Sequence, residues 1–299
     1  MACTATRLSF SHISLGVMLF LAPLAPCYGA AQSRGSLGGE PDQTWAGHRV
    51  VALEGFGDYF VSGDHGQPQL IKPEGLGVNI VAVVERVEGD RVWIKANGAG
   101  DVPVGWVNKK NVILLEDAIP YFTSLIERNP DDWDAYLRRA ESEHAQNQRD
   151  AAVADYTSAI KLHPDEPFLY LRRGRHFRTI KACGQAAADF EQVIHLKPQW
   201  AEPYNLEAGV YIDCPDPQYR DPVKAMGLIE HAIALDVEHP TYLTVLALSY
   251  FRSGQLDRAI NTQRQALESP RFPPGYREEA TNQLREYERV AAAQKSPPH

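Results

Sequence analysis

Three arginine residues occur three positions apart in a segment with a helical pattern. They are Arg172, Arg175 and Arg178, and no acidic residue occurs between Pro167 and Ala188. Side chains at this spacing drift only slowly around a helix, so the three guanidinium groups share one face. Arginine clusters recognise carboxylate and phosphate groups through charge-assisted hydrogen bonds. The cluster indicates either a binding site for an acidic partner or a solvated face that is paired with Asp and Glu residues on neighbouring elements.

No motif of catalytic chemistry accompanies this cluster. The chain lacks a nucleophile elbow, a P-loop and a His-Glu-x-x-His segment. Asp213, Asp216 and Asp221 crowd one stretch, but their spacing does not fit a calcium-binding EF-hand loop, and a solvated loop is favoured. We expect no enzymatic activity, no metal site and no cofactor. The formal net charge of -8 also argues against a nucleic-acid partner, because binding phosphates requires a basic surface.

A repeated step of 34 residues organises the middle of the chain. Prolines, tyrosines and small residues share it: Pro130, Pro164 and Pro198; Tyr136, Tyr170 and Tyr204; Ala140, Gly174 and Ala208. A pattern of small and aromatic residues with this period predicts stacked two-helix units. Such units bury a continuous core between neighbours and present a concave surface. An amphipathic segment from Tyr276 to Ala292 then predicts a helix that caps the stack.

The repeated segments resemble tetratricopeptide repeats. The first reads AYLRRAESEHAQNQRDAAVADYTSAIKLHP and the second LYLRRGRHFRTIKACGQAAADFEQVIHLKP; a third carries about five extra residues between its helices, and a fourth follows. The resemblance covers residues 117–269 and implies a protein or peptide partner held by the first helix of each unit. The residues that it assigns to this groove, together with Arg172, are Leu137, Glu141 and His144; Leu171, Arg175 and Arg178; Asn205, Gly209 and Ile212; Thr244, Leu248 and Phe251. The Lys and Asn set of the family's carboxylate clamp is not reproduced, so chaperone-tail binding is not implied.

Two cysteine residues lie in or beside the turns of successive repeats. These turns are neighbours in a stacked solenoid, so Cys183 and Cys214 are candidates for a disulfide in an oxidising compartment. Two free thiols are an equal alternative, because the inserted loop leaves their separation undetermined by sequence.

Residues 45–115 have a different character, with short runs of β-branched and aromatic residues broken by Gly, Asp and Pro. Glu88-Gly89-Asp90 predicts a hairpin turn, and the whole region predicts a small β-barrel. The stretch GDRVWIKANGAGDVPVGWVNKKNVI resembles the end of bacterial SH3-like domains. Trp93 and Trp106 are candidates for an aromatic ligand surface, with core packing favoured for at least one of them.

The N-terminus has the features of a secretory signal peptide. Arg7 precedes an apolar run from Ile13 to Leu24, and Gly29-Ala30-Ala31 offers small residues for cleavage. The apolar run is too short for a transmembrane helix. Leu24-Ala25-Pro26-Cys27 resembles a bacterial lipobox, which leaves lipid anchoring through Cys27 as an alternative.

The sequence therefore predicts a multi-domain protein with β and α parts. Its expected parts are a signal peptide (1–31), a linker (32–44), an SH3-like β-barrel (45–115), an all-α superhelical solenoid of tetratricopeptide type with a capping helix (116–293) and a mobile tail (294–299). We expect an exported, periplasmic or extracellular, non-catalytic adaptor that binds a protein or peptide, with an acidic partner as one option. The alternative is a cell-envelope module that docks on a wall polymer through the SH3-like domain.

Overall fold

The computed structural model describes residues 44–53, 59–62, 68–71, 81–96, 104–237 and 239–295. The predicted signal peptide, Cys27 and residues 32–43 of the predicted linker lie outside the described residues, as do residues 296–299 of the predicted tail. Residues 294 and 295 belong to the last helix instead of the tail.

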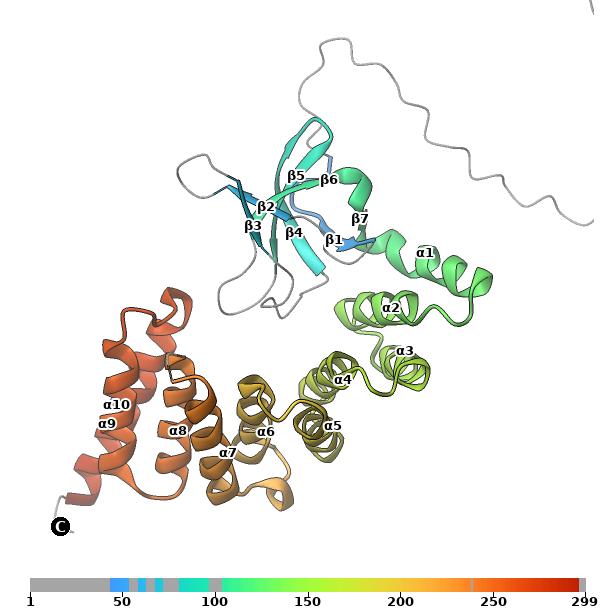
Figure 1. The fold of residues 1–299 in the computed structure, drawn as a ribbon. Helices are drawn as coiled ribbons and strands as arrows, with labels where there is room; N and C mark the ends of the chain where they lie inside the picture. The colour runs from blue at the N-terminus through green and yellow to red at the C-terminus, as the bar shows by residue number, and fades with distance from the viewer. Residues whose placement is uncertain are drawn as a thin grey trace, which may run out of the picture. The chain divides into compact units, whose positions relative to one another are not determined.

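Seven short strands form one antiparallel sheet (Figure 1). They are β1 (Arg49–Ala52), β2 (Tyr59–Ser62), β3 (Pro68–Ile71), β4 (Val81–Glu88), β5 (Arg91–Ala96), β6 (Val104–Asn108) and β7 (Val112–Leu114). Their order across the sheet is β3-β2-β6-β5-β4-β1-β7. The predicted hairpin turn is confirmed, since β4 and β5 pair up to Glu88 and Arg91 around Gly89 and Asp90. The sheet is not closed, because the end strands β3 and β7 do not pair among the described residues; an SH3-like barrel is therefore not confirmed.

Ten α-helices follow in the described part of the chain, as the repeat pattern predicts. They are α1 (Leu115–Arg128), α2 (Trp133–Ala145), α3 (Arg149–Leu162), α4 (Pro167–Thr179), α5 (Cys183–Leu196), α6 (Ala201–Asp213), α7 (Pro222–Leu235), α8 (Pro240–Arg252), α9 (Leu256–Glu268) and α10 (Pro274–Lys295). Four pairs, from α2–α3 to α8–α9, form the repeats. Eight residues separate α6 from α7, whereas three separate α2 from α3, which confirms the predicted insertion.

Small residues set the spacing within each pair. Ala140, Ala152 and Ala186 are fully buried where two helices meet. At Gly174 an added Cβ would lie 2.8 Å from Cε1 of Phe190, closer than real Cβ contacts allow. The small-residue positions of the sequence pattern are therefore points of close helix approach, and a larger side chain there would force the pair apart.

A buried ion pair recurs at the same 34-residue step. Arg139 on α2 donates to Asp155 on α3 at 2.5 and 2.8 Å, and also to the Thr123 hydroxyl on α1 at 3.0 Å. The equivalent trio in the next repeat is Arg173, Asp189 and Thr157, with distances of 2.9, 2.7 and 3.0 Å. Each arginine thus joins both helices of its own unit to the preceding unit.

The sheet and the first helices share one hydrophobic core. β7 continues directly into α1, and Val51 of β1 packs in one cluster with Leu115, Phe122 and Leu137. Arg138 on α2 donates from Nη1 to the Ala52 carbonyl oxygen at 2.8 Å. The β1–β7 end of the sheet therefore covers apolar surface of the first helices.

Candidate functional site

The first helices of the repeats, α2, α4, α6 and α8, form one row of the solenoid, and the second helices form the other (Figure 1). We call the surface of the first row the inner face. The predicted groove residues all come from these four helices, because one position type recurs in each unit. Their burial decides which of them a partner can reach.

Five predicted groove residues lie in the interior, which corrects the expectation that they face a partner. Their exposed fractions are 3% for Leu137, 7% for Glu141, 1% for Leu171, 5% for Arg172 and 4% for Ile212. The three apolar side chains belong to core clusters between helices. The first helices pack closely enough that these positions contact the next repeat instead of solvent.

Arg172 and Glu141 neutralise each other inside the solenoid. Their nearest atoms lie 3.7 Å apart, and the Tyr156 hydroxyl donates to Glu141 at 2.9 Å. The Arg172 guanidinium also lies 4.6 Å from the ring centre of Phe168. Burial, followed by the charge of Glu141, raises the pKa of Tyr156 well above its usual value. This polar cluster joins the first two repeats and leaves Arg172 unavailable to a ligand.

A histidine pair extends the same cluster. Nδ1 of His144 lies 2.7 Å from Nδ1 of His176, whose Nε2 lies 3.0 Å from the Arg149 carbonyl oxygen. A carbonyl can only accept, so Nε2 of His176 carries a proton and its Nδ1 accepts from His144. Burial and the neighbouring His144 lower the pKa of His176. His144 is therefore held by a structural contact, although it remains half-buried.

The buried carboxyl group of Glu143 lies beside the repeated ion pair and should make the stability of the protein depend on pH in an unusual way. Burial, followed by the charge of Asp155, raises the pKa of Glu143 from 4.5 to about 7. Its Oε2 has no hydrogen-bond partner in the described part of the chain. The pKa of Glu143 is higher in the folded protein than in the unfolded chain, so folding favours its protonated form. The stability that Glu143 contributes is therefore fully present below about pH 4.5 and is lost as the pH rises through about 7.

We expect Glu143→Gln to raise the free energy of unfolding at pH 8 by about 2 kcal/mol, and to change it little at pH 4.5. Urea denaturation of both proteins at the two pH values measures the difference, and Glu127→Gln, at an exposed position, is the control. His176 shifts stability in the opposite direction, but it is present in both proteins and cancels in the comparison. A gain of equal size at both pH values would contradict an ionisation effect.

The other eight predicted groove residues retain access to solvent, with Arg178 exposed and the rest half-buried. Phe251 is partly covered, since its ring stacks on Tyr287 of α10 at 4.5 Å. Arg175 forms an ion pair with Glu202 at the start of α6. Glu202 was not predicted as a partner of Arg175 from the sequence, because the residues of α4 and α6 that lie opposite each other depend on how the two helices pack. Arg178 lies beside Gly209 of α6, where an added Cβ would be 3.5 Å from its Nη1.

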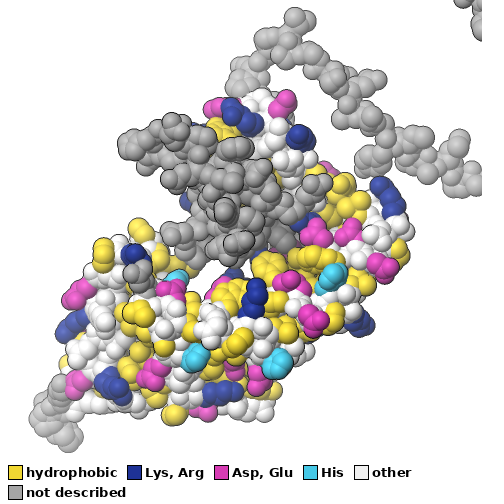
Figure 2. Space-filling view, viewed as in Figure 1, with side chains coloured by type: hydrophobic (Ala, Val, Ile, Leu, Met, Phe, Trp, Pro, Cys, Tyr) yellow, Lys and Arg dark blue, Asp and Glu magenta, His cyan; other side chains and the backbone are white. Residues whose placement is uncertain are grey.

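The arginine residues of α4 therefore do not form a single uncompensated row of positive charge. Carboxylates on other helices neutralise Arg172, Arg173 and Arg175. Figure 2 shows basic and acidic side chains interspersed over the visible solenoid surface. Reduced solvation and the like charge of Arg175 lower the pKa of the Arg178 guanidinium, despite the opposing effects of Asp213 and Glu202. Within the described residues, Arg178 is the member of the cluster whose side chain forms no ion pair.

Cys183 and Cys214 form a disulfide in the structure, with their Cα atoms 6.1 Å apart. Cys183 begins α5 and Cys214 caps α6, so the bond joins the second repeat to the third. Both residues are buried within a hydrophobic cluster that includes Phe190 and Val210. The bond fixes the end of α6 that follows Gly209 and Asp213.

Trp93 and Trp106 pair across neighbouring strands, on the sheet face opposite the buried Val92 and Val107. Their rings meet edge to face with centres 5.4 Å apart. Arg86 lies 4.8 Å from the Trp93 ring centre and 5.7 Å from that of Trp106. Both rings are half-buried, and neither belongs to the core cluster of the sheet. They form a surface row of aromatic and cationic groups.

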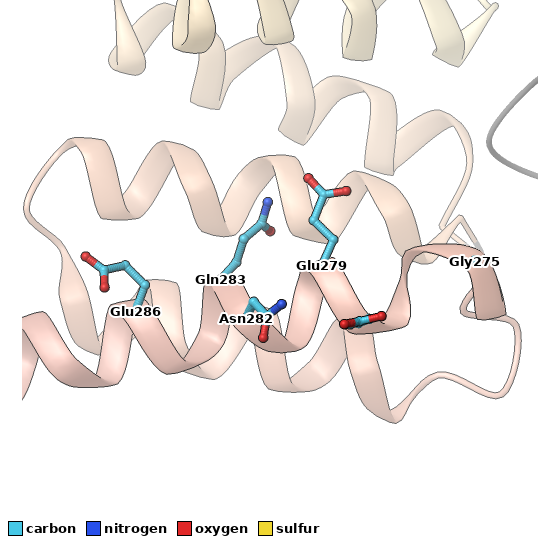
Figure 3. A pocket seen from close by; sticks show the side chains of 6 residues that line it. Gly275, Glu279, Asn282, Gln283 and Glu286 are labelled. Carbon is cyan, nitrogen blue, oxygen red and sulfur yellow. The ribbon is translucent and has the colours of Figure 1, made fainter.

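An acidic hollow lies along α10 (Figure 3). Its lining includes Glu278, Glu279 and Glu286. Figure 3 shows Glu279 and Gln283 projecting from the same side of the helix. The described residues contain no group of three His, Cys, Asp or Glu side chains arranged to hold a metal ion. Among the same residues, no helix combines the length and apolar character that a membrane crossing requires.

Comparison with known families identifies the helical units. Models of the tetratricopeptide repeat match residues 115–167 and residues 240–271. These segments are tetratricopeptide repeats. The matched regions are the first and last parts of the solenoid, and the second and third units between them carry the arginine cluster and the inserted loop. The resemblance of the sequence pattern to this repeat family is thereby confirmed for these two segments.

Similar folds occur among solved structures. MamA from Desulfovibrio magneticus RS-1 has 20% identity and a TM-score of 0.47, covering 52% of this chain and 86% of that one. A thermophilic tetratricopeptide protein of Thermus thermophilus, TTC0263, has 19% identity and a TM-score of 0.46, with coverages of 57% and 90%. YrrB, described as a tetratricopeptide protein with an unusual peptide-binding site, has 19% identity and a TM-score of 0.42, with coverages of 56% and 86%. No curated protein matches the sequence.

Proposed function

We propose that this protein is an exported, non-catalytic adaptor that holds a segment of another protein along the inner face of its repeats. The observation that carries the proposal is the set of accessible side chains on four successive first helices, which includes His144, Arg178, Asn205 and Leu248. These groups have mixed polar and apolar character and lie on the face that a stacked solenoid presents to partners. A rigid scaffold loses little conformational entropy on binding, and the buried Arg–Asp pairs supply such rigidity.

Export is part of the proposal. The N-terminal pattern of Arg7, an apolar run and small residues supports it, as does a disulfide between Cys183 and Cys214, because such bonds persist in oxidising compartments. We further propose that residues 45–115 form the N-terminal cap of residues 116–293. Solenoids need their terminal apolar surface covered, and Val51 and Arg138 contribute to such a covering contact.

Site-specific crosslinking tests the adaptor function. We expect a photoreactive residue at Thr244 or Leu248, on the inner face of α8, to capture the same partner from envelope extract of the native host. The matched control is Val223 on the second helix α7, where the side chain is 68% exposed. Capture from the inner positions and not from Val223 supports the proposal. Equal capture at all three positions, or none at the inner positions, contradicts it.

A second candidate is a cell-envelope module that binds a wall polymer through the sheet. The row of Arg86, Trp93 and Trp106 favours it, since aromatic and cationic groups together suit a ligand with apolar faces and negative charge. Sedimentation of the whole protein with purified wall material distinguishes the two candidates. The whole protein is needed because the sheet shares its core with α1 and α2.

A further inference from the structure

The exposed side chain of Arg178 has no charged partner among the residues that the structure describes. It lies one turn after Arg175 on α4, and Arg175 is already paired with Glu202. No hydrogen bond or ion pair joins the Arg178 side chain to another residue in the part of the chain that the structure describes, although its backbone carbonyl oxygen accepts from Lys181. Asp213 is near enough to influence its charge but forms no ion pair with it. One of the two guanidinium groups is thus available for an external anion.

The neighbouring helix leaves room for the guanidinium. Gly209 has no side chain, and Nη1 of Arg178 lies where a Cβ at Gly209 would be only 3.5 Å away. A long side chain at Gly209 would displace Arg178 from α6, whereas a single methyl group makes ordinary contact. Because Gly209 has no side chain, the Arg178 guanidinium can lie against the backbone of α6 while the other side of the guanidinium remains free.

Two further polar atoms at this place lack partners. Nε of Arg175 and Oδ1 of Asn205 are enclosed and make no hydrogen bond within the described residues. Asn205 is one turn before Gly209 on α6, and rotation of its amide can present a donor in place of the acceptor. Enclosed polar groups without partners cost free energy, and a ligand recovers this cost once the half-buried Arg175 and Asn205 side chains turn toward it. Both atoms and Arg178 belong to the α4–α6 part of the inner face.

We propose that Arg178, with Arg175 and Asn205, anchors a carboxylate of an acidic peptide segment at the α4–α6 junction. The inference rests on the proposed function and specifies the chemistry of the partner. Carboxylates accept charge-assisted hydrogen bonds from guanidinium groups, and exposed contacts of this kind weaken with salt. Glu202 remains bound to Arg175 from one side, so Arg178 determines the preference for acidic over neutral segments.

Fluorescence anisotropy with defined peptides tests the anchor on the full-length, oxidised protein. The probes are labelled hexaglutamate amide, hexaglutamine amide and hexaglutamine with a free C-terminus. We expect hexaglutamate to bind about tenfold more tightly than hexaglutamine amide at low salt, as one charge-assisted contact would give. Arg178→Gln and Gly209→Glu should remove most of this preference, the latter by placing a competing carboxylate beside Arg178. Gly209→Ala should keep it, and circular dichroism checks that each variant folds.

Each outcome has a defined meaning. If only hexaglutamine with a free C-terminus binds more tightly than hexaglutamine amide, the anchor binds a terminal carboxylate. If hexaglutamate amide binds more tightly than hexaglutamine amide, the anchor binds side-chain carboxylates. Equal affinity for all three peptides, or a preference that survives Arg178→Gln and Gly209→Glu, overturns the proposal. Crosslinking from Leu248 separates this result from the proposed function, because that capture persists if the inner face binds a partner without an acidic anchor.

Discussion

Replacing Cys183 and Cys214 together by alanine is expected to lower the free energy of unfolding by about 4 kcal/mol. The disulfide closes a loop across a sequence separation of 31 residues, and a crosslink over such a loop restricts the unfolded chain by an entropy of this size. Both residues are buried, at 8% and 3% exposure, so the substitutions also remove packing in the cluster around Phe190. Urea denaturation of the oxidised wild type and of Cys183→Ala/Cys214→Ala measures the loss.

The reduced wild type is the internal control, because it keeps both sulfur atoms and lacks only the bond. It should unfold at a midpoint between those of the oxidised wild type and the double variant, and closer to the double variant, because it loses the bond but keeps the packing of both side chains. A wild type whose unfolding midpoint is the same with and without reductant would show that the bond contributes nothing to stability. Since the bond holds the end of α6, its loss should also weaken the acidic-peptide preference that depends on Gly209 and Arg178.

Arg173→Met is expected to lower the free energy of unfolding by about 3 kcal/mol. The substitution removes two hydrogen bonds to Asp189 and one to Thr157, and leaves a carboxylate that is only 5% exposed without its counter-ion. Removing one partner of a buried pair is costly for this reason. Burial, only partly offset by Arg173, already raises the pKa of Asp189, so the ionised form depends on the arginine.

Two further variants test the explanation. Arg173→Met combined with Asp189→Leu should recover much of the loss, because it removes the orphaned charge as well. Arg289→Met breaks a pair with Glu286 in which the side chains are 70% and 47% exposed, and should lower the free energy of unfolding far less than Arg173→Met does. Urea denaturation at pH 7 compares all three. Equal losses for Arg173→Met and Arg289→Met would mean that burial of the pair is irrelevant.

Much of the candidate site could be located from the sequence, but its chemistry could not. The step of 34 residues placed Arg175, Arg178 and Asn205 on first helices, and these side chains do retain solvent access. The same alignment placed Leu137, Leu171 and Ile212 there, although they are buried. Alignment gives the position of a residue within a unit, whereas burial depends on how tightly the next unit packs.

The repeat, the helix pairs and the insertion could be predicted from the amino-acid sequence, because these depend on local periodicity and on small residues at a fixed step. Which charged side chains meet could not be predicted in this way. Arg172 pairs with Glu141 from the previous repeat, and Arg175 pairs with Glu202 from the next repeat. Both carboxylates lie on other helices, outside the segment from Pro167 to Ala188 that contains no acidic residue. Periodicity along one helix fixes the direction of a side chain but not the residue opposite it. The opposing residue depends on the packing of whole helices against each other, which places Arg178 beside Gly209 with no ion-pair partner among the described residues.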